Sequence, residues 1–134
     1  LNHNEISLME ALRIEQTDDS PEVILDQLNN CFEISGKSLP EDVVLFYQPI
    51  LDWLEEYRKN PKPFTRLDIK LSYFNTASSK QIMDILMIFE EMVEEGHEVV
   101  VRWHSMQSDE DMQEAGKEYE EMIDVPFEHS TYEK

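Results

Sequence analysis

The sequence has few of the residues that build disulfide frameworks, phosphate-binding loops or membrane spans. It contains one cysteine, Cys31, and three glycines that lie far apart. A single cysteine excludes an intramolecular disulfide, and the separated glycines leave no Gly-rich loop for nucleotide phosphates. No apolar run approaches the roughly 18 residues that a membrane helix needs. We therefore expect a cytoplasmic protein that does not insert into a membrane.

Basic residues are also scarce. The chain has 11 Lys and Arg against 30 Asp and Glu, for a net charge of -19. The electric field of this negative charge repels phosphate groups, so the composition argues against nucleic acid and anionic membranes as partners. A basic protein surface suits this charge better, although acidity can also do no more than keep a domain soluble.

The residues for metal binding and catalysis show no recognisable spacing. The four histidines share no metal-ligand pattern with Cys31, and no nucleophile motif is present. Cys31 stands beside Phe32 in an apparent strand, which favours a half-buried thiol over a nucleophile. We expect no metal, no cofactor and no enzymatic activity.

The length suits one domain that buries a core without disulfides or metal. Residues 1–10 lack clear periodicity, and we interpret them as a flexible extension or an expression-derived remnant. Residues 11–128 form the domain, and residues 129–134 are interpreted as a C-terminal tail.

Apolar periodicity predicts the elements of this domain. Alternation of apolar and polar residues indicates five strands, over residues 11–17, 22–28, 31–36, 66–73 and 97–105. Asn29-Asn30 is typical of a tight hairpin turn. Three helices are expected, one from a capping box of Ser38 and Glu41 to Pro61, one ending at Gly96, and one starting at Ser108.

The fourth strand predicts how the layers are arranged. Leu67, Ile69, Leu71 and Tyr73 alternate there with polar residues, so one sheet face is buried and the other is wet. In a doubly wound sheet helices cover both faces, and strands are apolar throughout. We therefore expect an α/β fold with a single mixed sheet and helices packed mainly on one face.

Small polar residues crowd the junction between this strand and the second helix. Ser78 and Gln81 fit a capping box, which places Thr76 just outside the helix on an exposed corner. A phosphoryl group on Thr76 would face free backbone amides and the positive end of the helix, with Lys80 within reach. The cluster is thus consistent with simple capping or with a phosphorylation switch.

An ordered series of motifs resembles the SiaC family of bacterial regulatory phosphoproteins, and it covers roughly Gln16 to Phe127. The motifs are GKSLPED, FYQPILDWLEEY, YFNTASSK, VVVRWHS, DEDMQEAG and VPF. Asp42 stands in LPED where the family pattern has Asn, and Ser105 follows WH where an aromatic residue is usual. Either departure bears on which partner is recognised.

The resemblance implies a fold similar to STAS domains and a role in partner switching. By this resemblance, a SiaB-like kinase phosphorylates Thr76 and a SiaA-like phosphatase of the PP2C type removes the phosphate. The unphosphorylated protein is then expected to bind and activate a diguanylate cyclase, which favours biofilm formation through cyclic di-GMP. Asn75, Ser78, Ser79 and Lys80 surround the threonine and are the expected partner contacts.

Two other functions remain open from the sequence. One is a small-molecule or anion-binding domain in which Arg102, His104 and the Thr76 corner line a pocket. The other is a constitutive protein-binding scaffold whose threonine is never modified.

Overall fold

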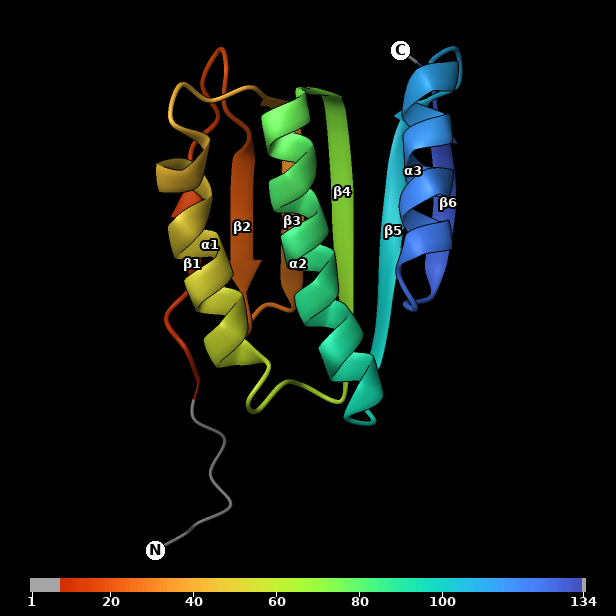
Figure 1. The fold of residues 1–134 in the computed structure, drawn as a ribbon. Helices are drawn as coiled ribbons and strands as arrows, with labels where there is room; N and C mark the ends of the chain where they lie inside the picture. Colours follow the sequence, from red (N-terminus) through yellow and green to blue (C-terminus); the bar gives the residue numbers. More distant parts are fainter. Residues whose placement is uncertain (1–7, 134) are drawn as a thin grey trace, which may run out of the picture.

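The computed structural model describes residues 8–133, which form one sheet of six strands covered by three helices (Figure 1). No helix in this part of the chain is long and apolar enough to cross a membrane. The elements in chain order are β1 (Leu12–Ile14), β2 (Glu22–Asp26), β3 (Cys31–Ser38), α1 (Val43–Tyr57), β4 (Phe64–Phe74), α2 (Thr76–Glu94), β5 (Glu98–Met106), α3 (Glu110–Met122) and β6 (Phe127–Tyr132).

The strands lie in the sheet in the same order as in the chain. β1, β2 and β3 are antiparallel neighbours, whereas β3 to β6 run parallel, with one helix in each crossover. Because every crossover steps in the same direction, right-handed connections place all three helices on the same face. The prediction of a single mixed sheet with helices on one face is confirmed (Figure 1).

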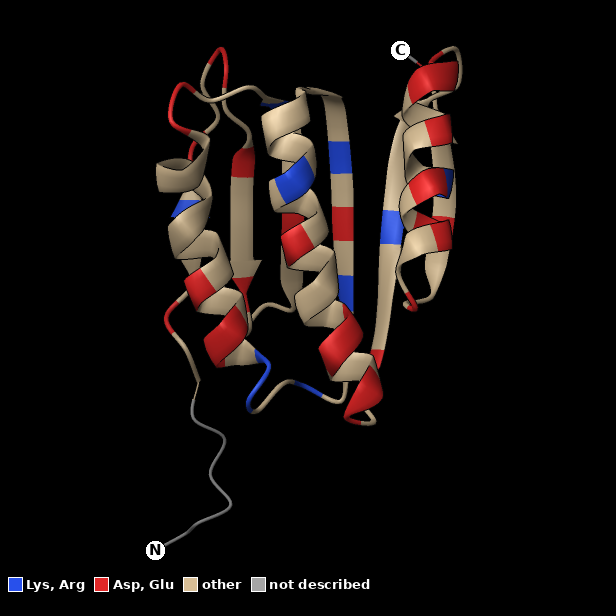
Figure 2. Ribbon diagram, in the orientation of Figure 1, with Lys and Arg blue, Asp and Glu red and all other residues tan. Residues whose placement is uncertain are grey.

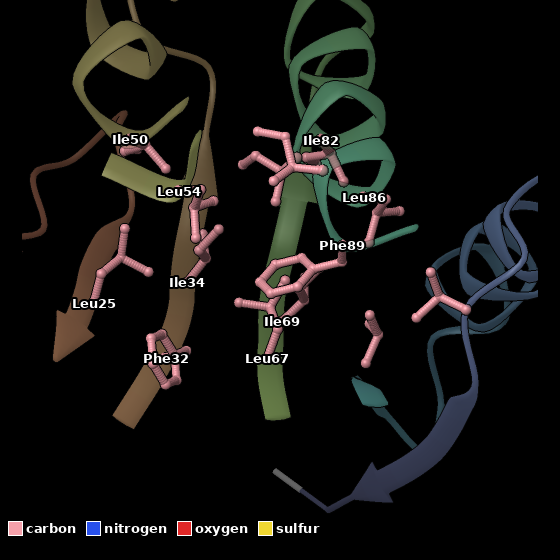
Figure 3. Close-up of a cluster of buried hydrophobic side chains, with 14 of the residues drawn as sticks. Leu25, Phe32, Ile34, Ile50, Leu54, Leu67, Ile69, Ile82, Leu86 and Phe89 are labelled. Atoms are coloured by element: carbon pink, nitrogen blue, oxygen red, sulfur yellow. The ribbon is translucent and has the colours of Figure 1, made fainter. Parts of the chain in front are cut away.

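The core lies between the helices and this face of the sheet. Figure 3 shows side chains of β2, β3 and β4 facing those of α1 and α2. Leu67, Ile69 and Leu71 are buried, as their alternation predicted. The other face carries charged pairs instead, such as Arg66 with Asp68. Burial of apolar area on one face only therefore explains the alternating pattern.

Trp103 joins α3 to the sheet. Its side chain is 1% exposed, and its indole Nε1 donates a hydrogen bond of 2.9 Å to the Met112 carbonyl. Gly116 lets the helix come this close, because a Cβ at that position would lie 2.5 Å from Cδ1 of Trp103. Phe74 and Tyr119 pack against the same ring. Trp103 is therefore part of the core.

The predicted starts of the first and third helices are wrong. Asp42 caps α1, since its Oδ1 accepts a hydrogen bond from the Leu45 amide at 3.1 Å. A cap at Ser38 would require a helical residue directly before Pro40, which the proline ring disfavours. Asp109 rather than Ser108 caps α3, and its carboxylate also meets the positive end of the helix.

Some apolar residues assigned to the core are exposed. Tyr73 is 51% exposed because the pairing of β3 and β4 shifts between Gly36 and Lys37, which ends the regular alternation. Val44 and Met122 continue the apolar stripes of α1 and α3 in the sequence but are also exposed. Both lie at helix ends, where the stripe no longer faces the sheet.

The ends of the domain differ from the prediction. Residues 129–132 were assigned to a tail, but they belong to β6, which pairs with β5. This strand lies at an edge and is mostly exposed, so its sequence lacks apolar alternation. At the other end, the Met9 amide donates to Gln27 and the Glu10 carbonyl accepts from Trp53. Met9 and Glu10 therefore contact the domain, while residues 1–7 lie outside the described residues.

Candidate functional site

All three helices begin where the parallel strands β3, β4 and β5 end, at the carboxyl edge of the sheet (Figure 1). At this edge only Asn75 separates the last residue of β4 from the first residue of α2. The Asn75 amide donates to the Ser38 carbonyl at 3.1 Å, so the end of β3 holds the junction in place. Thr76 therefore sits on a corner that two neighbouring strands fix.

Asn75 caps α2. Its Oδ1 accepts a hydrogen bond of 2.8 Å from the Ser78 amide, and its carbonyl accepts the first helical bond from Ser79. The predicted cap at Ser78 is therefore wrong, and Thr76 is the first residue of the helix rather than a residue outside it. The sequence offered several capping side chains, and only the strand end determines which of them reaches the free amides.

Ser78 belongs to a buried network of hydroxyl groups. Its Oγ donates to the Ser38 carbonyl at 2.9 Å and accepts from the Ser38 Oγ at 2.8 Å. The Tyr47 hydroxyl lies 2.6 Å from the same Ser38 Oγ and donates to it, since the serine proton is already used. Ser78 is fully buried, so it is not accessible to a partner in this structure.

The hydrogen bonds that Ser38 and Tyr47 make at this corner were not predicted from the sequence. Burial raises the pKa of Tyr47 above its usual range, which keeps the hydroxyl protonated as a donor. The network connects β3, α1 and α2 and leaves each of these hydroxyls bonded. One signal was available, because a tyrosine in a buried apolar stripe needs a polar partner for its hydroxyl.

Ser79 connects α2 to α3. The Tyr119 hydroxyl donates to the Ser79 carbonyl at 2.8 Å, and the Ser79 Oγ donates back to the Tyr119 oxygen at 3.0 Å. Burial raises the pKa of Tyr119, so this donor is also kept protonated. Ser79 is half-buried, and its polar groups hold the helices rather than project into solvent.

Thr76 differs from these neighbours. Its side chain is exposed, and its hydroxyl has no hydrogen-bond partner among residues 8–133. Lys80 follows one turn later on the same side of the helix. Its Nζ lies 3.2 Å from the Asp84 Oδ2. The first amides of a helix lack carbonyl partners, so a phosphoryl group on Thr76 would meet positive charge there. Of the polar residues at this corner, Thr76 is the one with a hydroxyl free for modification.

Three exposed apolar side chains lie in segments that begin or end at the same edge. Leu39 follows β3, Leu45 lies in the first turn of α1, and Tyr73 precedes the end of β4. Exposed apolar surface of this kind is typical of protein-binding sites. This edge therefore has exposed apolar side chains as well as the free hydroxyl of Thr76.

The alternative anion pocket does not form. Arg102 and His104 lie on the open face of the sheet, where they pair with Glu128 and Asp68. The His104 Nε2 is 2.7 Å from the Asp68 carboxylate, so both groups are already occupied. Thr76 starts a helix on the opposite face, and the structure does not bring the three residues together.

Cys31 lies at the start of β3 and is half-buried, as predicted. Burial, followed by the negative charge of Glu33, raises the pKa of its thiol. A raised pKa lowers the thiolate fraction at neutral pH, so the environment does not activate Cys31 as a nucleophile.

Replacing the cap tests the geometry of this corner. We expect Asn75→Ala to lower the free energy of unfolding by about 1 kcal/mol, because the Ser78 amide loses its acceptor. Ser108→Ala is the matched control, since Ser108 is exposed and does not cap α3; it should change stability by less than about 0.5 kcal/mol. Urea titrations of both variants measure the difference, and equal losses would contradict the assignment of the caps.

Comparison with known proteins adds an independent line of evidence. Residues 14–132 match the model of a family described as SiaC family regulatory phosphoprotein. The chain is 32% identical over 119 residues to an uncharacterized protein of Pseudomonas aeruginosa strain UCBPP-PA14, and this match covers 89% of the chain and 94% of the relative.

Solved structures from Pseudomonas aeruginosa have the same fold. The crystal structure of apo-SiaC superposes with a TM-score of 0.83 at 30% identity, over 92% of this chain and 100% of that one. A chain in the crystal structure of the diguanylate cyclase SiaD in complex with its activator SiaC gives a TM-score of 0.85 at 30% identity, over 90% and 99% of the two chains.

Proposed function

The chain belongs to the SiaC family of regulatory phosphoproteins, and we propose that it is a non-enzymatic switch protein that binds and activates a diguanylate cyclase. In this proposal Thr76 is the switch residue. A SiaB-like kinase adds a phosphoryl group to it, a SiaA-like phosphatase of the PP2C type removes that group, and only the unmodified form activates the cyclase. The protein acts in the cytoplasm and binds neither nucleic acid nor the membrane interior.

The observation that carries this proposal is the free hydroxyl of Thr76. Asn75 caps the helix, Ser78 is buried in a hydroxyl network and Ser79 is bonded to Tyr119. Hydrogen bonds within the fold therefore explain the polar side chains of Asn75, Ser78 and Ser79, but none explains the hydroxyl of Thr76. A kinase needs an exposed hydroxyl, and Thr76 offers one on a rigid corner.

The structures of relatives support the choice of partner. In the structure that contains SiaD, SiaC is named as the activator of this diguanylate cyclase. The likeness to that complex extends over 90% of the present chain. The family match over residues 14–132 includes the corner with Thr76. The chain offers a surface for docking rather than a reacting group, since Ser78 is buried and His104 is paired with Asp68.

The rate of cyclic di-GMP formation tests the proposal. The full chain is mixed with the diguanylate cyclase of the same organism and GTP. We expect the unmodified protein and Thr76→Ala to raise the rate, and the protein phosphorylated on Thr76 to leave it at the basal value. Intact-mass analysis after treatment with the kinase should show one phosphoryl group on the native chain and on Ser79→Ala, but none on Thr76→Ala. A rate that no form of the protein changes would contradict the proposal.

A further inference from the structure

A groove of about 580 Å³ runs between α1 and α2, from near the middle of α2 to the end farther from Thr76. It extends along α2 from Asp84 to Glu94, a length of about 15 Å at the rise of an α-helix. About ten residues of a docked helix fit into such a length. The groove starts about 12 Å from Thr76 along the helix axis, so it is separate from the switch corner.

The floor of the groove is apolar. Leu51 of α1 and Met87 and Ile88 of α2 line it. Met87 is 49% exposed although it stands in the middle of the helix, where its neighbours are buried in the core. A flexible methionine on an open apolar strip adapts its shape to an incoming side chain. Met87 therefore provides most of the exposed apolar surface of the groove, since Ile88 is buried and Leu51 is half-buried.

The rim of the groove is acidic. No Lys or Arg lines it, and the nearest cations are Arg58, which pairs with Glu55 and Glu91, and Lys80, which pairs with Asp84. Figure 2 shows acidic residues on the halves of α1 and α2 that lie farthest from the start of α2. Six carboxylates line the groove: Asp52, Glu55, Asp84, Glu90, Glu91 and Glu94.

A second copy of this chain does not fit the groove. Its own helices are acidic, and within the described helices the basic residues are only Lys80 and Lys117. With a net charge of -19 per chain, an acidic helix in an acidic groove would be repelled. The occupant must carry positive charge, and charge complementarity therefore points to a different protein.

We propose that this groove binds an amphipathic helix of a partner protein, with an apolar stripe on the floor and Lys or Arg side chains against the two acidic rims. Helix-in-groove recognition uses apolar anchors at positions i, i+3, i+4 and i+7, which match the width of one apolar strip. The site rests on the proposed function only in requiring a protein partner. Because it is separate from Thr76, it holds its occupant in both phosphorylation states.

Binding of a defined peptide tests this inference. The probe is a fluorescent synthetic 14-residue helical peptide with leucines at i, i+3, i+4 and i+7 and lysines and alanines elsewhere. Its affinity for the full chain is measured by anisotropy at physiological salt. We expect the triple variant Asp52→Asn, Asp84→Asn, Glu94→Gln to weaken binding by about tenfold, and Met87→Lys to weaken it further. The same peptide with glutamates in place of lysines should not bind.

A matched variant separates the groove from the general charge. Glu114→Gln, Glu118→Gln and Glu121→Gln remove three exposed carboxylates from α3, outside the groove, and should change affinity less than about twofold. Equal weakening by the two triple variants would show nonspecific attraction and overturn the site, as would absence of binding to the native chain. Thr76→Glu should bind the peptide with unchanged affinity. A native chain that stimulates the cyclase but does not bind the peptide would overturn this inference and leave the proposed function intact.

Discussion

Trp103→Ala is expected to lower the free energy of unfolding by about 3 to 5 kcal/mol. The indole is 1% exposed, lies against Gly116 of α3 and packs with Phe74 and Tyr119. Removing it leaves a cavity between the sheet and α3, and the Met112 carbonyl loses its donor. Urea or guanidinium titration at fixed salt measures the change.

Tyr73→Ala is the control for this prediction, because Tyr73 is an aromatic residue of β4 that the structure leaves half exposed. It should cost less than about 1 kcal/mol. The two variants together test which face of the sheet is buried. A loss below about 1 kcal/mol for Trp103→Ala, or equal losses for both variants, would show that the faces are assigned wrongly.

The layer arrangement could be predicted from the sequence because burial on one face leaves a direct pattern. Leu67, Ile69 and Leu71 alternate with polar residues, since the helices cover only one side of β4. Strand β6 was not predicted because this pattern depends on burial, and β6 is mostly exposed. As an exposed edge strand it buries little on either face, so no alternation appears between Phe127 and Tyr132.

The helix starts could not be predicted because several residues compete for each cap. Ser38 and Ser108 satisfy the local rule, but Asp42 and Asp109 are the caps. Ser38 stays in β3 because its backbone and hydroxyl bond to Asn75 and Ser78, which lie about 40 positions away in the chain. Local capping rules do not contain such contacts.

The candidate site was predictable in part. Thr76 was predicted on an exposed corner just outside the helix; the structure makes it the first residue of α2, with its side chain exposed. The roles of its neighbours were not predictable, since Ser78 is buried against Ser38 and Ser79 is bonded to Tyr119 of α3. Both contacts join segments 40 positions apart, so only the folded chain reveals that these hydroxyls are already in use.

Phosphorylation of Thr76 is expected to weaken binding of the cyclase by about 1 to 3 kcal/mol, which is roughly five- to 150-fold. The phosphoryl group adds nearly two negative charges and considerable bulk to the corner. The first amides of α2 and Lys80 provide local partners for it, so the fold should stay intact while the docking surface beside Leu39 and Leu45 changes. Calorimetry with unmodified and stoichiometrically phosphorylated protein at fixed salt measures the difference.

Substitutions at Thr76 separate the contributions of charge and bulk. Thr76→Ala should retain the affinity of the unmodified protein, because the hydroxyl makes no hydrogen bond within residues 8–133. Thr76→Glu should weaken binding, whereas the neutral Thr76→Gln, of nearly the same size, should weaken it less if charge dominates. Circular dichroism should show the same fold for every form. Equal affinity of the unmodified and phosphorylated proteins would exclude the switch, and it would leave a scaffold that binds its partner whatever the state of Thr76.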